Sequence, residues 1–229
     1  MGNAKSKSLL PNNKKELNRW ETQHELVRLL AHGNFHAPMD EALSDRGIMV
    51  LEVGCGTGNW VLEMSKDYPL FFFLTFTRVE WIEAIDELVR VTKPGGWIEI
   101  VEFDPILERP GPTCDRFLKS FQTICEARDI HFEVGFNLPQ LLGKLDNVHS
   151  DKMAATVGWN GRVGQLAAQN SHLIAMGLAE KLAPELGVSM EEYTQLAAKF
   201  IKECSEHKAW GKIPYAYGMK PLSSGVEHT

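Results

Sequence analysis

The segment from Ile48 to Gly58 constrains the fold of this chain more than any other. Residues 48–53 (Ile-Met-Val-Leu-Glu-Val) form an almost continuous apolar run, which is typical of a strand buried inside a parallel sheet. The run leads directly into residues 54–58 (Gly-Cys-Gly-Thr-Gly), and a helix is expected to follow over Asn59–Asp67. Alternating glycines let the backbone turn tightly and approach a ligand without Cβ collisions, and the next helix presents free N–H groups. The segment therefore predicts an α/β domain with a ligand-binding loop at the end of a strand.

Two familiar glycine-rich motifs do not fit this loop. The dinucleotide-binding fingerprint G-x-G-x-x-G needs a third glycine at position 59, where the chain has Asn. The phosphate-binding pattern G-x-x-x-x-G-K-[ST] does not occur in the sequence. What remains is E-x-G-x-G-x-G over Glu52–Gly58. A purely structural glycine turn is the alternative interpretation.

The rest of the chain alternates between predicted helices and strands, as expected of an α/β protein. Residues 77–80 have the pattern of a capping box that opens a helix to Val91, and residues 94–96 (Pro-Gly-Gly) predict a tight turn. A final edge strand is expected at Ile213–Tyr217, because Pro214 cannot donate a backbone hydrogen bond and is tolerated only at a sheet edge or at the start of a strand. The other expected elements are helices over 16–32, 112–128, 138–145, 164–181 and 190–207, and strands over 70–76, 97–101 and 148–156.

The composition is that of an ordinary globular protein. The 229 residues are ample for a buried core, and a net charge of −6 argues against a broad nucleic-acid-binding surface. The longest strongly apolar stretch, Leu70–Phe76, is too short to span a bilayer, and the first residues lack the apolar core of a secretory signal. We expect a cytoplasmic protein with a leader over 1–15 and a single domain over 16–229. Within that domain we expect a helical cover over 16–47, an α/β core over 48–157, and C-terminal helices with a final strand over 158–229.

The cysteines and histidines do not predict a metal site. His32 and His36 are four residues apart, but Gly33 breaks the helix that would align them, so a loop is the favoured interpretation. The cysteines contain no C-x-x-C pair, and their spacings of 59, 11 and 79 residues fit neither zinc nor a disulfide scaffold. Reduced thiols are expected of Cys55, Cys114, Cys125 and Cys204.

The E-x-G-x-G-x-G pattern in its strand–loop–helix context resembles motif I of class I S-adenosyl-L-methionine-dependent methyltransferases. Residues 77–102, with the turn Val-Thr-Lys-Pro-Gly-Gly at 91–96, resemble the helix, turn and fifth strand of that fold. Gln23-His24, Gly158-Trp159 and residues 215–218 (Tyr-Ala-Tyr-Gly) resemble a group of fungal methyltransferases related to secondary-metabolism regulators. The resemblance extends from about Leu17 to Pro221, and motif I is its most specific part.

This resemblance implies a Rossmann-like, three-layer α/β/α fold and methyl transfer from S-adenosyl-L-methionine to an acceptor that the sequence does not identify. The acidic residue of motif I orients the amino group of the cofactor, and Gln23 on the first helix would contact the cofactor as well. No catalytic residue is assigned, because direct methyl displacement depends mainly on alignment and on the electrophilic cofactor. The residues implied to hold the methionyl part are Glu52, Gly54, Cys55, Gly56, Thr57 and Gly58.

Several scattered side chains are candidates for the acceptor site. Glu133, Glu102 and Asp104 could act as a general base, although surface or turn positions are the alternative. Tyr215, Tyr217 and Trp159 could line an acceptor pocket, and packing of the rings in the core or at an edge is the alternative.

The segment between the glycine loop and the Pro-Gly-Gly turn is shorter than the corresponding segment of the methyltransferase fold that the chain resembles. Only 35 positions separate Gly58 from Lys93, which accommodates a helix, a strand and a second helix of about 5–12 residues each. We therefore expect an incomplete sheet of about five strands, in which the first strand becomes an exposed edge. The acid that binds the cofactor ribose in the family is not found after residues 70–76, which lead into Thr77 and Arg78. Cofactor recognition would rest on the glycine loop.

Two interpretations of this shortening remain open. The chain is a shortened gene model or splice product of a longer enzyme, with a junction near Pro69–Phe73. Alternatively, it is a diverged, catalytically inactive interaction protein built on the remnant of the fold.

The first residues carry a candidate lipid signal. Residues 1–6 (Met-Gly-Asn-Ala-Lys-Ser) match the M-G-x-x-x-[ST] pattern for myristoylation of Gly2. Lys5, Lys7, Lys14 and Lys15 follow, and a basic cluster can supply the second signal that one acyl chain needs. This predicts peripheral attachment to the cytoplasmic face of a membrane. A polar leader that matches a short pattern by chance is the alternative.

Overall fold

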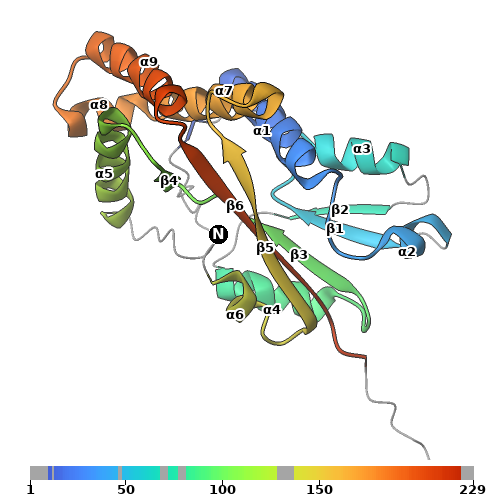
Figure 1. Cartoon of the computed structure of the whole chain (residues 1–229). Helices are drawn as coiled ribbons and strands as arrows, with labels where there is room; N and C mark the ends of the chain where they lie inside the picture. Colours follow the sequence, from blue (N-terminus) through green and yellow to red (C-terminus); the bar gives the residue numbers. More distant parts are fainter. Residues whose placement is uncertain are drawn as a thin grey trace, which may run out of the picture. The chain divides into compact units, whose positions relative to one another are not determined.

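The computed structural model describes residues 10–11, 13–45, 48–67, 72–76, 81–127 and 137–222, with the backbone alone for 72–76 and 81–83. The helices and strands are those of a mixed α/β protein (Figure 1). The chain divides into two compact units. The first contains Met1–Leu30, Asp104–Phe132 and Ala154–Lys212, and the second contains Ala31–Phe103, Glu133–Met153 and Ile213–Thr229. The domain boundaries expected at 47 and 157 stay a prediction.

The first unit is built mainly from helices whose apolar faces pack together. It contains α1 (Lys14–Ala31) as far as Leu30, and α5 (Pro112–Glu126), α7 (Gly161–Gly177), α8 (Ala179–Leu186) and α9 (Met190–Glu206). Tyr193 of α9 is completely buried in the shared core with Phe117 of α5 and Leu182 of α8. The hydroxyl of Tyr193 donates to the carbonyl of Ala175 at 2.6 Å, which satisfies the one polar atom that the ring buries.

Local sequence signals determine where several of these helices begin and end. Ser189 and Glu192 form a reciprocal capping box at the start of α9. Gly187 ends α8 in a left-handed conformation with φ of +67°. The stretch predicted to be helical over 164–181 is helical but divided, because α7 ends at Gly177 and α8 begins two residues later. Glycine is the weakest helix former after proline, which favours this break.

Two parallel strands of the second unit, one before and one after the glycine loop in the sequence, form a small sheet. β1 (Met49–Val53) pairs with β2 (Phe72–Phe76), and α3 (Asn59–Asp67), with the predicted bounds, connects them. The apolar run predicts a buried β1, but Met49 is 65% and Val53 45% exposed. Among the described strands, β1 pairs with only β2. One edge of β1 therefore lacks a described partner, as the short segment predicts.

A second, antiparallel sheet has β6 (Trp210–Met219) at its centre. Residues 215–219 of β6 pair with β3 (Trp97–Val101), and residues 210–211 pair with β4 (Leu107–Glu108). β5 (Asp146–Thr156) also pairs with β6. The expectation of an edge strand here is therefore wrong.

Pro214 is compatible with a central strand because it lies where the pairing of β6 changes. Its carbonyl accepts the backbone N–H of Glu102 at 2.9 Å, but proline has no N–H to donate in return. β3 ends at Val101, one residue before this incomplete pair. The next bond joins the N–H of Asp104 to the carbonyl of Lys212 at 3.1 Å.

The antiparallel strands of the second unit carry an apolar core on one face. Ile98 and Ile100 of β3 and Ala216 of β6 are buried with Ile85 of α4 (Trp81–Val91) and Leu138 of α6 (Leu138–Leu141), helices that lie beside this end of the sheet (Figure 1). Because side chains alternate along a strand, residues 97, 99, 215 and 217 project from the opposite face.

The described strands therefore form two sheets, not the single Rossmann-like sheet of about five strands that the resemblance implies. β1 and β2 share a ladder only with each other, and the antiparallel strands gather around β6. Among the described helices, none is long and apolar enough to cross a membrane. Gly2, Lys5, Lys7, the capping box at 77–80 and Glu133 lie outside the described residues.

Candidate functional site

The loop after β1 has the backbone geometry that its glycines predict. Gly54, Gly56 and Gly58 have φ values of +86°, +53° and +77°, a region that other residues avoid. The N–H of Gly58 donates to the carbonyl of Cys55 at 2.7 Å, and its carbonyl accepts the N–H of Leu62 at 3.0 Å. Among the described residues, a Cβ at Gly54 or Gly58 would meet no atom within 4 Å. Conformation therefore requires glycine at these two positions, and no described residue crowds them.

Glu52 carries a buried, unsatisfied oxygen two residues before the first glycine of the loop. Its Oε2 is buried and has no hydrogen-bond partner among the described residues, although buried polar atoms are nearly always paired. Burial raises the pKa of Glu52 from 4.5 to about 7, because the carboxylate loses hydration. A cationic group beside Oε2 would satisfy this oxygen and lower the pKa again.

Glu52 and the loop together offer complementary groups within one short segment. The first N–H groups of α3 have no partner inside the helix and favour an anion or another hydrogen-bond acceptor. The carboxylate of Glu52 favours a cation. Cys55, a free thiol, and Thr57 are half-buried in the loop between them. A ligand that carries both an ammonium and a carboxylate group, as an amino acid does, matches this arrangement.

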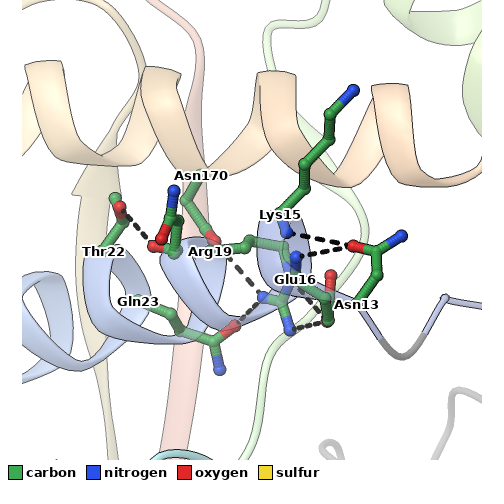
Figure 2. Close-up of polar contacts among 8 residues, drawn as sticks. Asn13, Lys15, Glu16, Arg19, Thr22, Gln23 and Asn170 are labelled. Atoms are coloured by element: carbon green, nitrogen blue, oxygen red, sulfur yellow. Dashed lines mark hydrogen bonds and ion pairs between the residues drawn. The ribbon is translucent and has the colours of Figure 1, made fainter.

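Gln23 lies in a polar network on α1, which Figure 2 shows. The guanidinium of Arg19 donates to Oε1 of Gln23, to Glu16 at 2.8 Å and to Asn170 of α7 at 3.3 Å. The Arg19 and Glu16 side chains are only 7% and 4% exposed. Gln23 therefore has a protein partner in the first unit, whereas the glycine loop belongs to the second. Its contact with a cofactor stays a prediction.

A carboxylate–imidazole pair lies in the second unit. Oε2 of Glu99 accepts the backbone N–H groups of His36 and Ala37, both at 2.8 Å, and Oε1 lies 2.9 Å from Nδ1 of His36. The His36 ring stacks on Tyr215 with a centroid distance of 3.8 Å and an interplanar angle of 11°. His36 is in the loop between α1 and α2 (Asp40–Asp45), which confirms the loop interpretation of this segment. The described residues hold no group of three or more side chains suited to a metal ion.

Tyr215 and Tyr217 lie close to further rings on the same face of the sheet. The Tyr217 ring is 5.8 Å from Trp97 in an edge-on arrangement and 5.1 Å from His149 of β5. His149 is also 6.4 Å from Tyr215. Trp159, the third predicted pocket residue, belongs to the first unit, where its Nε1 donates to the carbonyl of Ala209 at 2.7 Å. Its place in an acceptor pocket stays a prediction.

The two predicted acids that the structure describes, Glu102 and Asp104, have different surroundings. Oε2 of Glu102 accepts the backbone N–H of Phe103 at 3.3 Å. Asp104 is 8% exposed, and its Oδ2 has no hydrogen-bond partner among the described residues. Burial raises the pKa of Asp104, although a backbone hydrogen bond from Ile106 and the charge of Lys212 oppose the rise. A role as a general base stays a prediction for both.

Sequence reasoning did not single out Glu99 or His149. A signal for Glu99 was present, because it is the single acid in the otherwise apolar strand Trp-Ile-Glu-Ile-Val. A carboxylate on a half-buried strand needs a partner. That partner, His36, is 63 residues away along the chain, and no local pattern connects the two.

Comparisons with known proteins do not show a family. No protein-family model matches the chain, and no curated protein sequence matches it. Among solved structures, the [4+2]-cyclase SpnF is similar over 93% of this chain and 99% of its own, with 13% identity and a TM-score of 0.31. Similarity at this level supports no inference about fold, cofactor or reaction.

Proposed function

We propose that this chain binds S-adenosyl-L-methionine through the segment from Glu52 to Gly58 and transfers its methyl group to an acceptor. The observation that carries the proposal is the unsatisfied, buried Oε2 of Glu52 directly before a loop with three left-handed glycines. Glu52 would hold the amino group of the methionyl part, and the loop and the first turn of α3 would hold its carboxylate. The cofactor supplies an electrophilic methyl group when bound.

The affinity is expected to be modest. No acid directly follows β2, which leads into Thr77 and Arg78, and the next acid, Glu80, belongs to the expected capping box. The ribose hydroxyls would then lack the acceptor that the methyltransferase resemblance implies. Recognition would then depend on the glycine loop and Glu52.

Calorimetric titration with S-adenosylhomocysteine tests the proposal. We expect binding in the micromolar range that Gly56→Val abolishes, because valine cannot adopt φ of +53° without strain of about 1–3 kcal/mol and would add bulk to the loop. Gly187→Val is the matched control. Gly187 has φ of +67° and open space around it, so this variant carries similar strain outside the loop and should keep the affinity. Absence of binding by the folded wild-type chain would refute the proposal.

A second candidate function is that of an inactive interaction protein. Exposed apolar side chains on β1, Met49 and Val53, and the edge of β1 that lacks a described partner favour pairing with another chain. Light scattering across a concentration series tests this candidate. A chain that binds no cofactor but associates, and that becomes monomeric as Met49→Lys, would support it over the enzyme.

Membrane attachment through acylated Gly2 is a separate proposal. Its support is the sequence pattern and the adjacent lysines alone. The intact mass of protein made in a eukaryotic host should include one myristoyl group, and Gly2→Ala should release a membrane-bound pool. An unmodified Gly2 would refute the attachment.

A further inference from the structure

Glu99 holds the imidazole of His36 in one orientation. The carboxylate of Glu99 accepts two backbone N–H groups and contacts Nδ1 at 2.9 Å, so Nδ1 is the nitrogen that carries the hydrogen. The two side chains are only 13% and 16% exposed, and Tyr215 covers one face of the ring. Nε2 makes no hydrogen bond with the described residues, and its lone pair is free to accept a proton.

The loop that carries His36 is bonded to the helix that follows the glycine loop. The carbonyl of Asn34 accepts Nε1–H of Trp60 at 2.6 Å, and its side-chain amide donates to Asp67 at 3.2 Å. Trp60 is the second residue of α3. His36 is two residues after Asn34. The loop with His36 therefore contacts, through Asn34, the helix that begins after the glycine loop, within the second unit.

Tyr215 stacks on the imidazole, and further flat side chains lie beside Tyr215 and Tyr217 on this face of the sheet. Tyr215 and Tyr217 are half-buried, and the rings of Trp97 and His149 approach Tyr217 from two sides. Aromatic faces and edges of this kind pack well against a planar ring. The titratable groups that contact His36 are Glu99 on β3 and Tyr215 on β6. Those near Tyr215 are Tyr217 on β6 and His149 and Asp151 on β5.

We propose that His36 is the general base for a planar, phenol-like acceptor and that Glu99 is its positioning residue. The O–H bond of the phenol breaks, its proton moves to Nε2 of His36, and the electron pair stays on the phenol oxygen. The carboxylate of Glu99 stabilises the resulting imidazolium. An imidazole deprotonates a phenol, with a pKa of about 10, far more readily than an aliphatic alcohol. The inference rests on the proposed methyl transfer, which consumes the phenolate, but the proton transfer itself needs no cofactor.

Optical titration with 4-nitrophenol tests the base directly, because its phenolate is coloured and its phenol is not. At a pH where the free probe is mostly protonated, we expect the wild-type chain to raise the phenolate absorbance and His36→Asn to lose this increase. Glu99→Gln keeps an oxygen for the two backbone N–H groups, but it removes the charge and turns its amide N–H2 toward Nδ1 of His36. The phenolate signal should therefore be lost or require a higher pH. His207→Asn, which replaces an exposed imidazole at the end of α9, is the matched control and should keep the wild-type signal.

Titration with S-adenosylhomocysteine on the same samples separates this inference from the proposed function. Unchanged affinity together with a lost phenolate signal in His36→Asn supports both, and the rate of methylation of the probe should then fall about 10²-fold. A phenolate signal without cofactor binding supports the base and refutes methyl transfer. No signal in the wild type, or an equal signal in His36→Asn, overturns the base. If circular dichroism shows that His36→Asn is unfolded, the phenolate signal of Glu99→Gln decides: a lost signal or one shifted to higher pH supports the base, and an unchanged profile overturns it.

Discussion

As the pH rises, Glu52→Gln should gain stability relative to the ligand-free wild type, and at every pH it should remove affinity for the cofactor. Burial raises the pKa of Glu52 from 4.5 to about 7, so the folded chain holds this proton more tightly than the unfolded chain does. The stability that results is complete below the unfolded pKa and is lost as the pH rises through the folded pKa. Glutamine does not titrate, and the variant should lack this loss.

The size of the effect follows from the change in pKa. At about 1.4 kcal/mol per pKa unit, the wild type should lose about 2–3 kcal/mol of unfolding free energy between about pH 5 and pH 8 because of Glu52 alone. Burying the glutamine amide has a cost of its own, but that cost is the same at both pH values. The difference between variant and wild type should therefore shift by about 2–3 kcal/mol in favour of Glu52→Gln at the higher pH.

Urea unfolding followed by tryptophan fluorescence at both pH values measures this shift. Glu41→Gln is the control, because Glu41 is an exposed carboxylate on α2 in the same unit. The change in unfolding free energy that Glu41→Gln causes should be the same at both pH values. An equal effect of Glu52→Gln at both pH values would refute the argument that Oε2 is desolvated and unpaired. An unchanged affinity for S-adenosylhomocysteine would refute the role of Glu52 in cofactor binding.

The remaining predictions concern stability in the first unit, each measured by urea unfolding. Arg19→Ala should cost about 3–5 kcal/mol, because it leaves the carboxylate of Glu16 buried without its partner. Gly111→Ala should cost about 1–3 kcal/mol through crowding, since a Cβ there would lie 2.5 Å from Oε2 and 2.6 Å from Cβ of Glu203. Tyr193→Phe should cost about 1 kcal/mol, because it removes a buried hydrogen bond.

An exposed ion pair supplies the control for the buried one. Arg162 contacts Glu25 at 2.6 Å, but the two side chains are 61% and 47% exposed. Arg162→Ala should therefore change the unfolding free energy by less than about 1 kcal/mol. A loss as large as that of Arg19→Ala would mean that burial is not the source of the larger effect.

Short-range patterns were sufficient for the individual elements. α3 and β3 have the predicted bounds, because the glycine loop and the turn at 94–96 set their first residues. The positive φ values of Gly54, Gly56 and Gly58 also follow from residue type. The division of the predicted helix 164–181 was missed, since a break at Gly177 depends on a propensity difference of about 1 kcal/mol.

Strand pairing could not be deduced in this way. Pro214 suggested an edge strand, but β6 pairs with three strands. The backbone N–H that proline lacks is not needed there, because Pro214 lies just beyond the end of β3. The exposure of Met49 and Val53 likewise depends on which segments cover the faces of β1, and hydrophobicity along the strand does not encode that.

The amino-acid sequence by itself determined the local chemistry of this protein: a strand, a loop that only glycines can form, and an acid placed just before it. Each depends on the conformational freedom of a few neighbouring residues. The tertiary structure decided that Oε2 of Glu52 has no described partner and that Glu99 meets His36 and Tyr215. Desolvation and pairing depend on contacts between residues far apart in the chain, because a side chain's surroundings exist only once those segments have packed together.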